Sequence, residues 1–269
     1  MTTTLQLRSA RLRVADLGRS QAFYAGVLGL VPGSISEAGG RTLALHAPGG
    51  AEPLLTLVET PGARPKPPGA PGLFHLALLV PDRPALARVL RRLAETRTPI
   101  HGLSDHGVSE AIYLEDPDGN GLELYADRPR ERWHTADGKL VMFTRALDTG
   151  ALIATTPDAR AAGLPAGTVI GHIHLRTSSL AAAESFYTGP LGLSVSTREY
   201  PGALFLGADG YHHHVAVNTW GRPSPPGDHA YVYAGLERVE IALRGLDAPR
   251  TLTDPDGLRV DLVPLKASP

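Results

Sequence analysis

The chain has 269 residues, and 26 Lys and Arg stand against 27 Asp and Glu, so its formal net charge is −1. Apolar residues make up 42% and charged residues 20%, which is the balance of a globular protein. A nucleic-acid partner is not expected, because phosphate binding requires a clustered excess of basic side chains. The absence of cysteine excludes disulfides, thiolate metal ligands and cysteine nucleophiles. Any metal must therefore be held by carboxylates and by some of the 11 histidines.

The N-terminal residues lack the basic start and apolar centre of a secretory signal. No apolar run approaches the roughly 20 residues that a membrane helix needs. We therefore expect a cytoplasmic protein with no membrane partner. The 30 Gly and 24 Pro favour many short strands and turns over long helices.

Apolar residues at helical spacing predict helices over 16–28, 83–97 and 179–191, each preceded by a strand. The first and third belong to an internal repeat, because residues 12–30 align without a gap on residues 175–193. Nine positions are identical, including the Phe-Tyr pair of each helix. Such a repeat indicates a duplicated structural unit.

A second repeat lies further along each half of the chain. The sequence DPDG occurs at 116–119 and at 254–257, and each copy leads into an apolar strand. Pro fixes φ and Gly tolerates positive φ, so each copy predicts a turn. The repeats together divide the chain into four modules, at about 5–60, 72–128, 168–220 and 230–265. The fourth is too short to hold a helix between its strands.

The pattern resembles the vicinal oxygen chelate superfamily, whose proteins are built from paired βαβββ modules. The motifs that carry it are LRVADLGRSQAFYAGVLGL, SDHGVSEAIYLEDPDGNGLELYADRP, GHIHL and YHHHVAVNTW. The resemblance implies an α+β fold of four βαβββ-type modules, the fourth truncated, paired into two barrel-like domains. These domains would span residues 1–128 and 168–269, and residues 129–167 would form a linker with no assigned function.

Within the superfamily, the chain is most similar to the two-domain catechol-2,3-dioxygenase (type I extradiol) group. This similarity implies metal ligands on the first and last strands of the modules. In the C-terminal half those positions hold His172, His214 and Glu240, with Asp261 as a weaker candidate. A site of two His and one carboxylate suits non-haem Fe(II), and Mn(II) is a second possibility.

Several further side chains are candidates for a role in this site. Alternate residues of a strand share a face, so His172 and His174 would point the same way, as would His212 and His214, opposite to His213. We expect His174, His212 and His213 to hydrogen-bond behind the ligands or to act in acid–base catalysis. Three aromatic residues are candidates for the pocket wall: Phe205, Tyr231 and Tyr233.

The N-terminal half holds His75 and Glu123 at the corresponding positions of the second module. These two residues allow three interpretations. They are the remnant of a decayed site, or an ordinary buried hydrogen-bonded pair, or the partners of His172 and His214 if the modules pair differently.

The resemblance implies a metal-dependent extradiol ring-cleaving dioxygenase that acts on a small aromatic diol of the catechol type with O₂. The alternatives are a glyoxalase-like metal-dependent isomerase or lyase, and a metal-free small-molecule binding or resistance protein of the same fold. A homodimer is also expected from the resemblance.

Overall fold

The computed structural model describes residues 4–136, 139–157, 160–221 and 231–265. Eight strands lie in the part of the chain before the expected linker: β1 (Leu5–Val14), β2 (Val31–Ser36), β3 (Thr42–His46), β4 (Pro53–Glu59), β5 (Gly72–Leu79), β6 (Gly102–Asp105), β7 (Ser109–Glu115) and β8 (Gly121–Asp127). The strands that follow are β9 (Thr135–Ala136), β10 (Lys139–Leu140), β11 (Arg145–Ala146), β12 (Val169–Arg176), β13 (Ser194–Thr197), β14 (Ala203–Gly207), β15 (Val215–Asn218), β16 (Gly235–Leu243), β17 (Arg250–Thr253) and β18 (Arg259–Pro264).

The helices are few and short. They are α1 (Leu17–Gln21), the π-helix η1 (Ala22–Val27), α2 (Arg83–Glu95), the 3₁₀ turn η2 (Arg130–Arg132), α3 (Thr149–Ile153) and α4 (Leu180–Thr188). The three predicted helices are thus confirmed to within a few residues. Between β16 and β17, residues 244–249 turn without a helix, as expected for a truncated fourth module.

The helix starts follow from side-chain caps. A helix leaves its first backbone N–H groups without partners, and a polar side chain just before it can accept from one of them. Asp16 accepts from the N–H of Arg19, and Ser179, at the same place in the repeat, accepts from that of Ala182. Asp82 caps α2 in the same way. The capping residues therefore set these starts locally.

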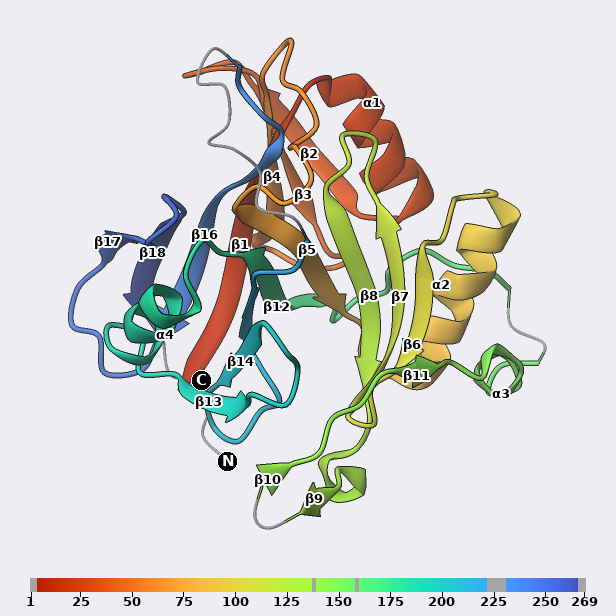
Figure 1. Ribbon diagram of the computed structural model, residues 1–269. Coiled ribbons are helices and arrows are strands. Elements are labelled where there is room, and N and C mark those ends of the chain that lie inside the picture. The colour runs from red at the N-terminus through yellow and green to blue at the C-terminus, as the bar shows by residue number, and fades with distance from the viewer. Residues whose placement is uncertain (1–3, 137–138, 158–159, 222–230, 266–269) are drawn as a thin grey trace.

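Two large mixed sheets curl into half-barrels, which confirms the α+β fold class (Figure 1). The first has the strand order β17-β18-β16-β1-β4-β3-β2, and the second the order β11-β6-β7-β8-β5-β12-β15-β14-β13. The first module therefore pairs with the fourth, through β1 and β16, and the second pairs with the third, through β5 and β12. Each sheet combines strands from both sides of residues 129–167, so the expected division of the chain does not separate the sheets.

The repeated DPDG turn has a structural role in both halves. The hydroxyl of Tyr24 donates to Asp116 at 2.9 Å, and the hydroxyl of Tyr187 donates to Asp254 at 3.0 Å. Both tyrosines are fully buried. In each half, the helix of one module is thereby tied to the turn of the next, which explains why the Phe-Tyr pair and DPDG recur together.

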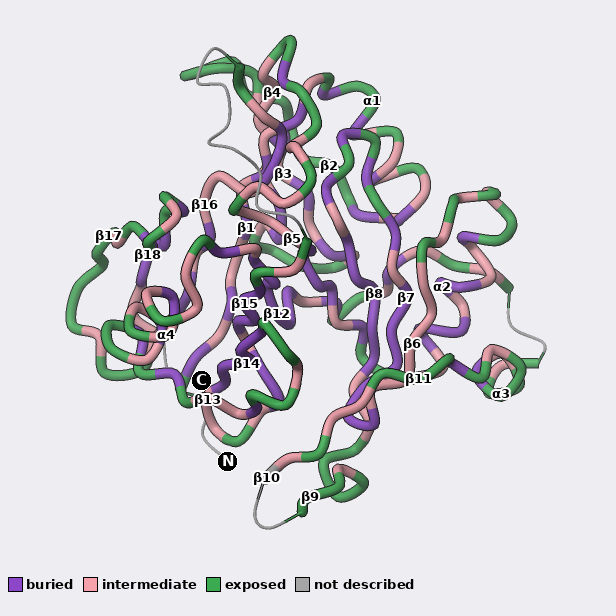
Figure 2. The backbone as a smooth tube through the Cα atoms, in the orientation of Figure 1, coloured by how far each residue is buried: buried purple, intermediate pink, exposed green. Residues whose placement is uncertain are grey.

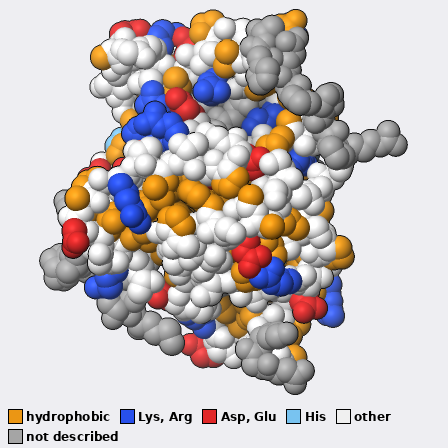
Figure 3. All heavy atoms as spheres, turned by 60° about the vertical axis from the view of Figure 1, so that its left-hand side comes forward, with side chains coloured by type: hydrophobic (Ala, Val, Ile, Leu, Met, Phe, Trp, Pro, Cys, Tyr) orange, Lys and Arg blue, Asp and Glu red, His pale blue; other side chains and the backbone are white. Residues whose placement is uncertain are grey.

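Burial is concentrated along the central strands, and the loops and outer helix faces are exposed (Figure 2). On the face that Figure 3 shows, acidic and basic side chains are interspersed around a band of hydrophobic ones. Within the described residues, no helix is long and apolar enough to cross a membrane.

Candidate metal centre

Three neighbouring strands of the nine-stranded sheet, β8, β5 and β12, bring His75, Glu123 and His172 together. Ala77 of β5 lies opposite Glu123 on one side and His172 on the other. Paired residues of adjacent strands share a face, and His75 precedes Ala77 by two residues, so it shares that face too. The module pairing therefore aims all three side chains at one point.

The three groups converge through one atom each. Nε2 of His75 lies 3.0 Å from Oε2 of Glu123, and Nε2 of His172 lies 3.1 Å from the same oxygen. The two Nε2 atoms are 3.3 Å apart. Ligands about 2.1 Å from one ion and at right angles are about 3.0 Å apart, so these separations fit a shared metal ion. Among the described residues, no other His, Asp and Glu side chains form such a group of three.

The protonation states also fit a metal site. Burial lowers the pKa of His172 to about 4, which leaves its imidazole neutral near pH 7. Burial alone would raise the pKa of Glu123, but the adjacent His172 and His75 outweigh it and hold that pKa well below its usual range. Neutral imidazoles and an ionised carboxylate are the forms that bind metal. Nδ1 of His172 is buried with no hydrogen-bond partner among the described residues, so the hydrogen bonds of this ring to those residues all involve Nε2.

Close packing explains the glycine before His172. A Cβ on Gly171 would lie 1.8 Å from the hydroxyl of Tyr125, so no larger residue fits there without moving that ring. Tyr125 follows Glu123 by two residues on β8, and its ring lies 4.9 Å from that of His172. Its hydroxyl is 2.8 Å from that of Tyr211. Gly171 thus leaves room for the side chain of Tyr125 against β12, beside the candidate ligands.

The expected ligand set of His172, His214 and Glu240 is not brought together. Glu240 lies on β16 in the seven-stranded sheet, paired with Ser9 and Asp261. The physical reason is the module pairing, because β12 borders β5 and β15 rather than β16. Of the alternative N-terminal pair, both members join His172. Of the three interpretations of His75 and Glu123, the geometry therefore matches the one in which the modules pair differently and these two residues meet His172. His214 does not join them.

Asp261 is engaged in the same seven-stranded sheet. Its Oδ1 accepts from the hydroxyl of Thr251 at 2.6 Å, and its other oxygen forms an ion pair with Arg238. Each oxygen of this carboxylate therefore has a protein partner without a metal.

The histidines of YHHHV lie just before β15, which begins only at Val215, in an irregular segment with bends. His214 stacks against Tyr211, and its Nδ1 accepts from the N–H of Ala208 at 3.2 Å. His212 and His213 instead face one another, with their Nδ1 atoms 2.8 Å apart. His212 and His214 both contact Tyr211, whereas His213 lines the cavity, so the expected ligand His214 is not among the described lining residues.

His174 lies on the same face as His172 and lines the same pocket, as alternation predicts. Its Nε2 is 2.8 Å from Nδ2 of Asn218. The side-chain oxygen Oδ1 of Asn218 accepts from the N–H of Trp220, which fixes the amide so that its NH₂ group donates to His174. This nitrogen of His174 is therefore already occupied.

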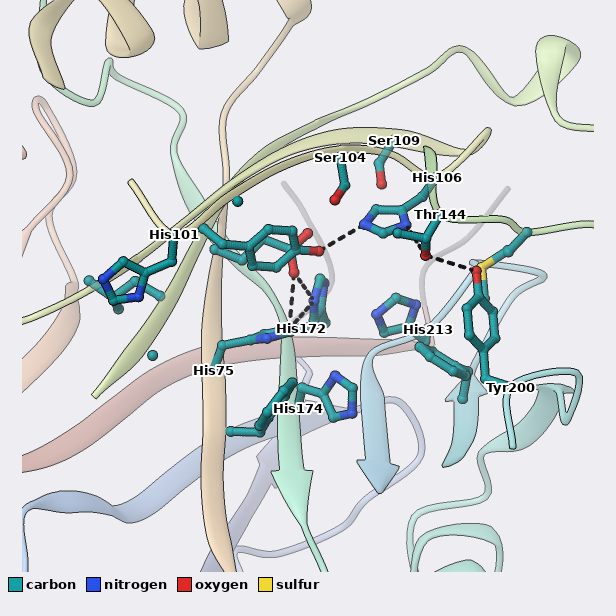
Figure 4. Close-up of a pocket in the computed structure, with 18 of the residues that line it drawn as sticks. His75, His101, Ser104, His106, Ser109, Thr144, His172, His174, Tyr200 and His213 are labelled. Carbon is teal, nitrogen blue, oxygen red and sulfur yellow. Dashed lines mark hydrogen bonds and ion pairs between the residues drawn. The ribbon is translucent and has the colours of Figure 1, made fainter. Parts of the chain in front are cut away.

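A cavity of about 480 Å³ opens beside the three convergent residues (Figure 4). His75 and His172 point toward one another at its base, with His213 and His106 further along the wall. Aromatic and apolar side chains form much of the lining, and none of the lining residues that the structure describes is Lys or Arg. Of the three expected wall residues, Phe205 lines the cavity, and Tyr231 and Tyr233 are not among the lining residues.

Sequence reasoning missed several wall residues. Tyr113 lies opposite Glu123 across β7 and β8, and its hydroxyl is 2.8 Å from Nε2 of His106. Tyr113 could have been identified by pairing the two strands on either side of the DPDG turn, because the turn fixes which of their residues lie opposite one another. Met142 and Thr144 also line the cavity, although they come from the stretch that had no assigned function. Nothing local in the sequence distinguishes these two.

Comparisons with known proteins agree with this architecture. The family model of the "Glyoxalase/Bleomycin resistance protein/Dioxygenase superfamily" matches residues 6–124. A protein of Bacillus subtilis (strain 168) named "Catechol-2,3-dioxygenase" is 45% identical over 222 residues, which cover 81% of this chain and 76% of that protein.

Two solved structures show the same fold at low sequence identity. A putative dioxygenase from Bacillus subtilis subsp. subtilis str. 168 superposes with a TM-score of 0.63 at 13% identity, covering 98% of this chain and 86% of that one. Glyoxalase I from Zea mays gives a TM-score of 0.55 at 17% identity, covering 97% and 92%. Identities this low show the fold alone.

Proposed function

Because the chain belongs to the glyoxalase/bleomycin resistance protein/dioxygenase superfamily, we propose that it is a metal-dependent extradiol dioxygenase that cleaves a catechol-type ring with O₂. One observation carries the proposal. His75, Glu123 and His172 converge at the base of an aromatic-lined cavity, in a chain that is 45% identical to a relative named for this activity.

The three convergent residues would hold Fe(II), with Mn(II) as the second candidate. Two imidazoles and one carboxylate are the donor set of non-haem Fe(II) sites that keep open positions. When bound, such an ion would act as a Lewis acid that favours the ionised form of a coordinated hydroxyl.

A side chain of the protein must accept the proton that the catechol loses. His213 lines the cavity, and its ring centroid lies 4.2 Å from that of His172. His174 is also close, but Asn218 occupies its Nε2. His213 is therefore the side chain we assign as the proton acceptor near the candidate ligands.

The cavity wall favours a neutral, apolar substrate. Phe74, Phe205 and Trp220 pack around His174 and make this side of the cavity apolar. Among the described residues of the lining, none is a Lys or Arg that could bind a carboxylate, and Glu115 contributes negative charge. The volume exceeds what a single ring needs. We therefore propose catechols with an uncharged apolar substituent as the substrate class.

The geometry favours this function over its alternatives. A glyoxalase-like isomerase or lyase would be expected to use more carboxylates, and Glu123 is the single carboxylate in the cluster. A metal-free binding protein gives no reason for two imidazoles and a buried carboxylate to converge through single atoms. No specific observation favours the isomerase or lyase, or the metal-free binding protein.

The test is to purify the protein anaerobically, load it with Fe(II) or Mn(II), and measure O₂ uptake with a panel of catechols. We expect one metal ion per chain, one O₂ consumed per catechol, and both atoms of ¹⁸O₂ in the ring-opened product. Loaded protein that consumes no O₂ with any catechol would contradict the dioxygenase proposal. Failure to bind either metal would contradict the metal site as well.

A further inference from the structure

Asp127, His212 and His213 form a chain of hydrogen bonds that ends at the cavity. We propose that Asp127 and His212 are positioning residues that hold His213 in the tautomer with a bare Nε2 facing the cavity. The catalytic consequence rests on the proposed function, but the tautomer itself does not.

The chain of hydrogen bonds is built from two segments of the protein that are far apart in sequence. Asp127 ends β8, four residues after Glu123, so the two carboxylates leave the same face of the strand. Oδ1 of Asp127 lies 2.9 Å from Nε2 of His212. Nδ1 of His212 then lies 2.8 Å from Nδ1 of His213. The strand that supplies one candidate ligand thus also supplies the start of this chain.

Packing holds His212 in place. Its side chain is fully buried, and its ring lies 4.0 Å from that of Tyr211 and 5.5 Å from that of Trp133. Its backbone carbonyl accepts from the hydroxyl of Ser196. With its ring and backbone both fixed, His212 cannot turn to exchange its two nitrogens.

The direction of the hydrogen bonds follows from what each group can do. An ionised carboxylate can only accept, so Nε2 of His212 must carry the proton. A neutral His212 then has a bare Nδ1, which must accept from Nδ1–H of His213. That leaves Nε2 of His213 without a proton. Among the hydrogen bonds of the described residues, none involves this nitrogen.

The end of the chain lies where a proton acceptor is needed. His213 is 8% exposed and lines the cavity, with its ring packed between His172 and Phe205. A ring held in this tautomer can accept a proton from a substrate hydroxyl, whereas the opposite tautomer can only donate. The tautomer therefore decides whether His213 can serve as the base.

Asp127→Asn is the informative variant, because the introduced NH₂ group can donate to His212. His212 would then carry its proton on Nδ1, and His213 would carry its own on Nε2. Long-range ¹H–¹⁵N spectra of histidine-labelled, metal-free protein report the two tautomers directly. We expect Nδ1–H on His213 in the wild type and Nε2–H in Asp127→Asn. Nε2–H in the wild type, or an unchanged tautomer in the variant, would overturn the proposal.

The second readout is turnover by the metal-loaded protein. We expect Asp127→Asn to lower kcat about 100-fold, the lower end of the usual contribution of general acid–base catalysis, with KM within about threefold and metal content unchanged. Asp127→Glu should recover part of the lost kcat, because it restores an acceptor. Asp261→Asn, which removes a carboxylate from the other sheet, should leave kcat unchanged. Wild-type kcat in Asp127→Asn would overturn the catalytic consequence of the tautomer.

The two readouts separate this inference from the proposed function. If the wild type consumes no O₂ with any catechol but the tautomers change as expected, the dioxygenase proposal fails and the positioning role of Asp127 and His212 stands. If turnover is present and the tautomer of His213 is independent of Asp127, the dioxygenase proposal stands and the positioning role of Asp127 and His212 fails.

Discussion

Nε2 of His75 and Nε2 of His172 lie 3.3 Å apart, although 97 residues separate them in the chain. His75 belongs to the second module and His172 to the third, so the contact exists only because β5 pairs with β12. The candidate metal centre is therefore built across the junction of the two halves of the chain, and neither half contains it alone.

The repeated tyrosine–aspartate contact should stabilise the fold without affecting the chemistry. Tyr24→Phe and Tyr187→Phe each leave a buried carboxylate without one hydrogen bond, so each should lower the free energy of unfolding by about 1–3 kcal/mol. Urea denaturation of the metal-free protein measures the loss. Tyr231→Phe, at a side chain that is 41% exposed, is the matched control and should change little. Equal stability of all three variants would show that the contact contributes nothing.

Acidification should destabilise the protein over a pH range that is set partly by the pKa of His214. Burial lowers the pKa of His214 from 6.5 to about 4 in the folded state, so between these values the unfolded chain binds the extra proton. Stability therefore falls as the pH drops through this window, by up to about 1.4 kcal/mol per pH unit for one such group.

The variant His214→Gln isolates that contribution, because its amide oxygen can still accept from the N–H of Ala208. Its stability deficit relative to the wild type should be smaller at pH 5 than at pH 7.5, by about 2 kcal/mol. Guanidinium denaturation of the metal-free protein at the two values measures the difference. A deficit that is independent of pH would refute the assignment.

Glu115 should bias the cavity against anionic substrates. Its carboxylate lies at the cavity edge, 3.7 Å from Nδ1 of His101, and is 51% exposed. Glu115→Gln should raise kcat/KM for a carboxylated catechol relative to a neutral one by about two- to fivefold, because exposed charges interact weakly. Glu37→Gln, an exposed carboxylate paired with Arg41, is the control. An unchanged ratio would remove Glu115 from substrate selection.

The fold could be predicted largely from the sequence because its determinants are local or repeated. The copy of residues 12–30 at 175–193 located two helices and two strands, and the caps Asp16 and Ser179 set where those helices start. The fold class followed from the resemblance to a known superfamily, and the absence of a helix after β16 followed from the short fourth module. These features need no knowledge of which modules touch.

The site could be predicted only in part, because it depends on the module pairing. His172 was placed by the repeat, and His75 and Glu123 were found as its alternative partners. The choice between Glu123 and Glu240 is a tertiary property that no local pattern encodes. Met142 and Thr144 reach the cavity from a stretch with no repeat partner.

The most direct measurement is the metal affinity of two matched variants, Glu123→Gln and Glu240→Gln, loaded anaerobically with Fe(II) and analysed for bound iron. The two changes are chemically identical and lie on different sheets. Glu123→Gln should weaken iron binding by more than about 100-fold, beyond the usual loss from residues behind a ligand, while Glu240→Gln should bind one iron as tightly as the wild type. Loss of iron from Glu240→Gln with retention in Glu123→Gln would contradict the account.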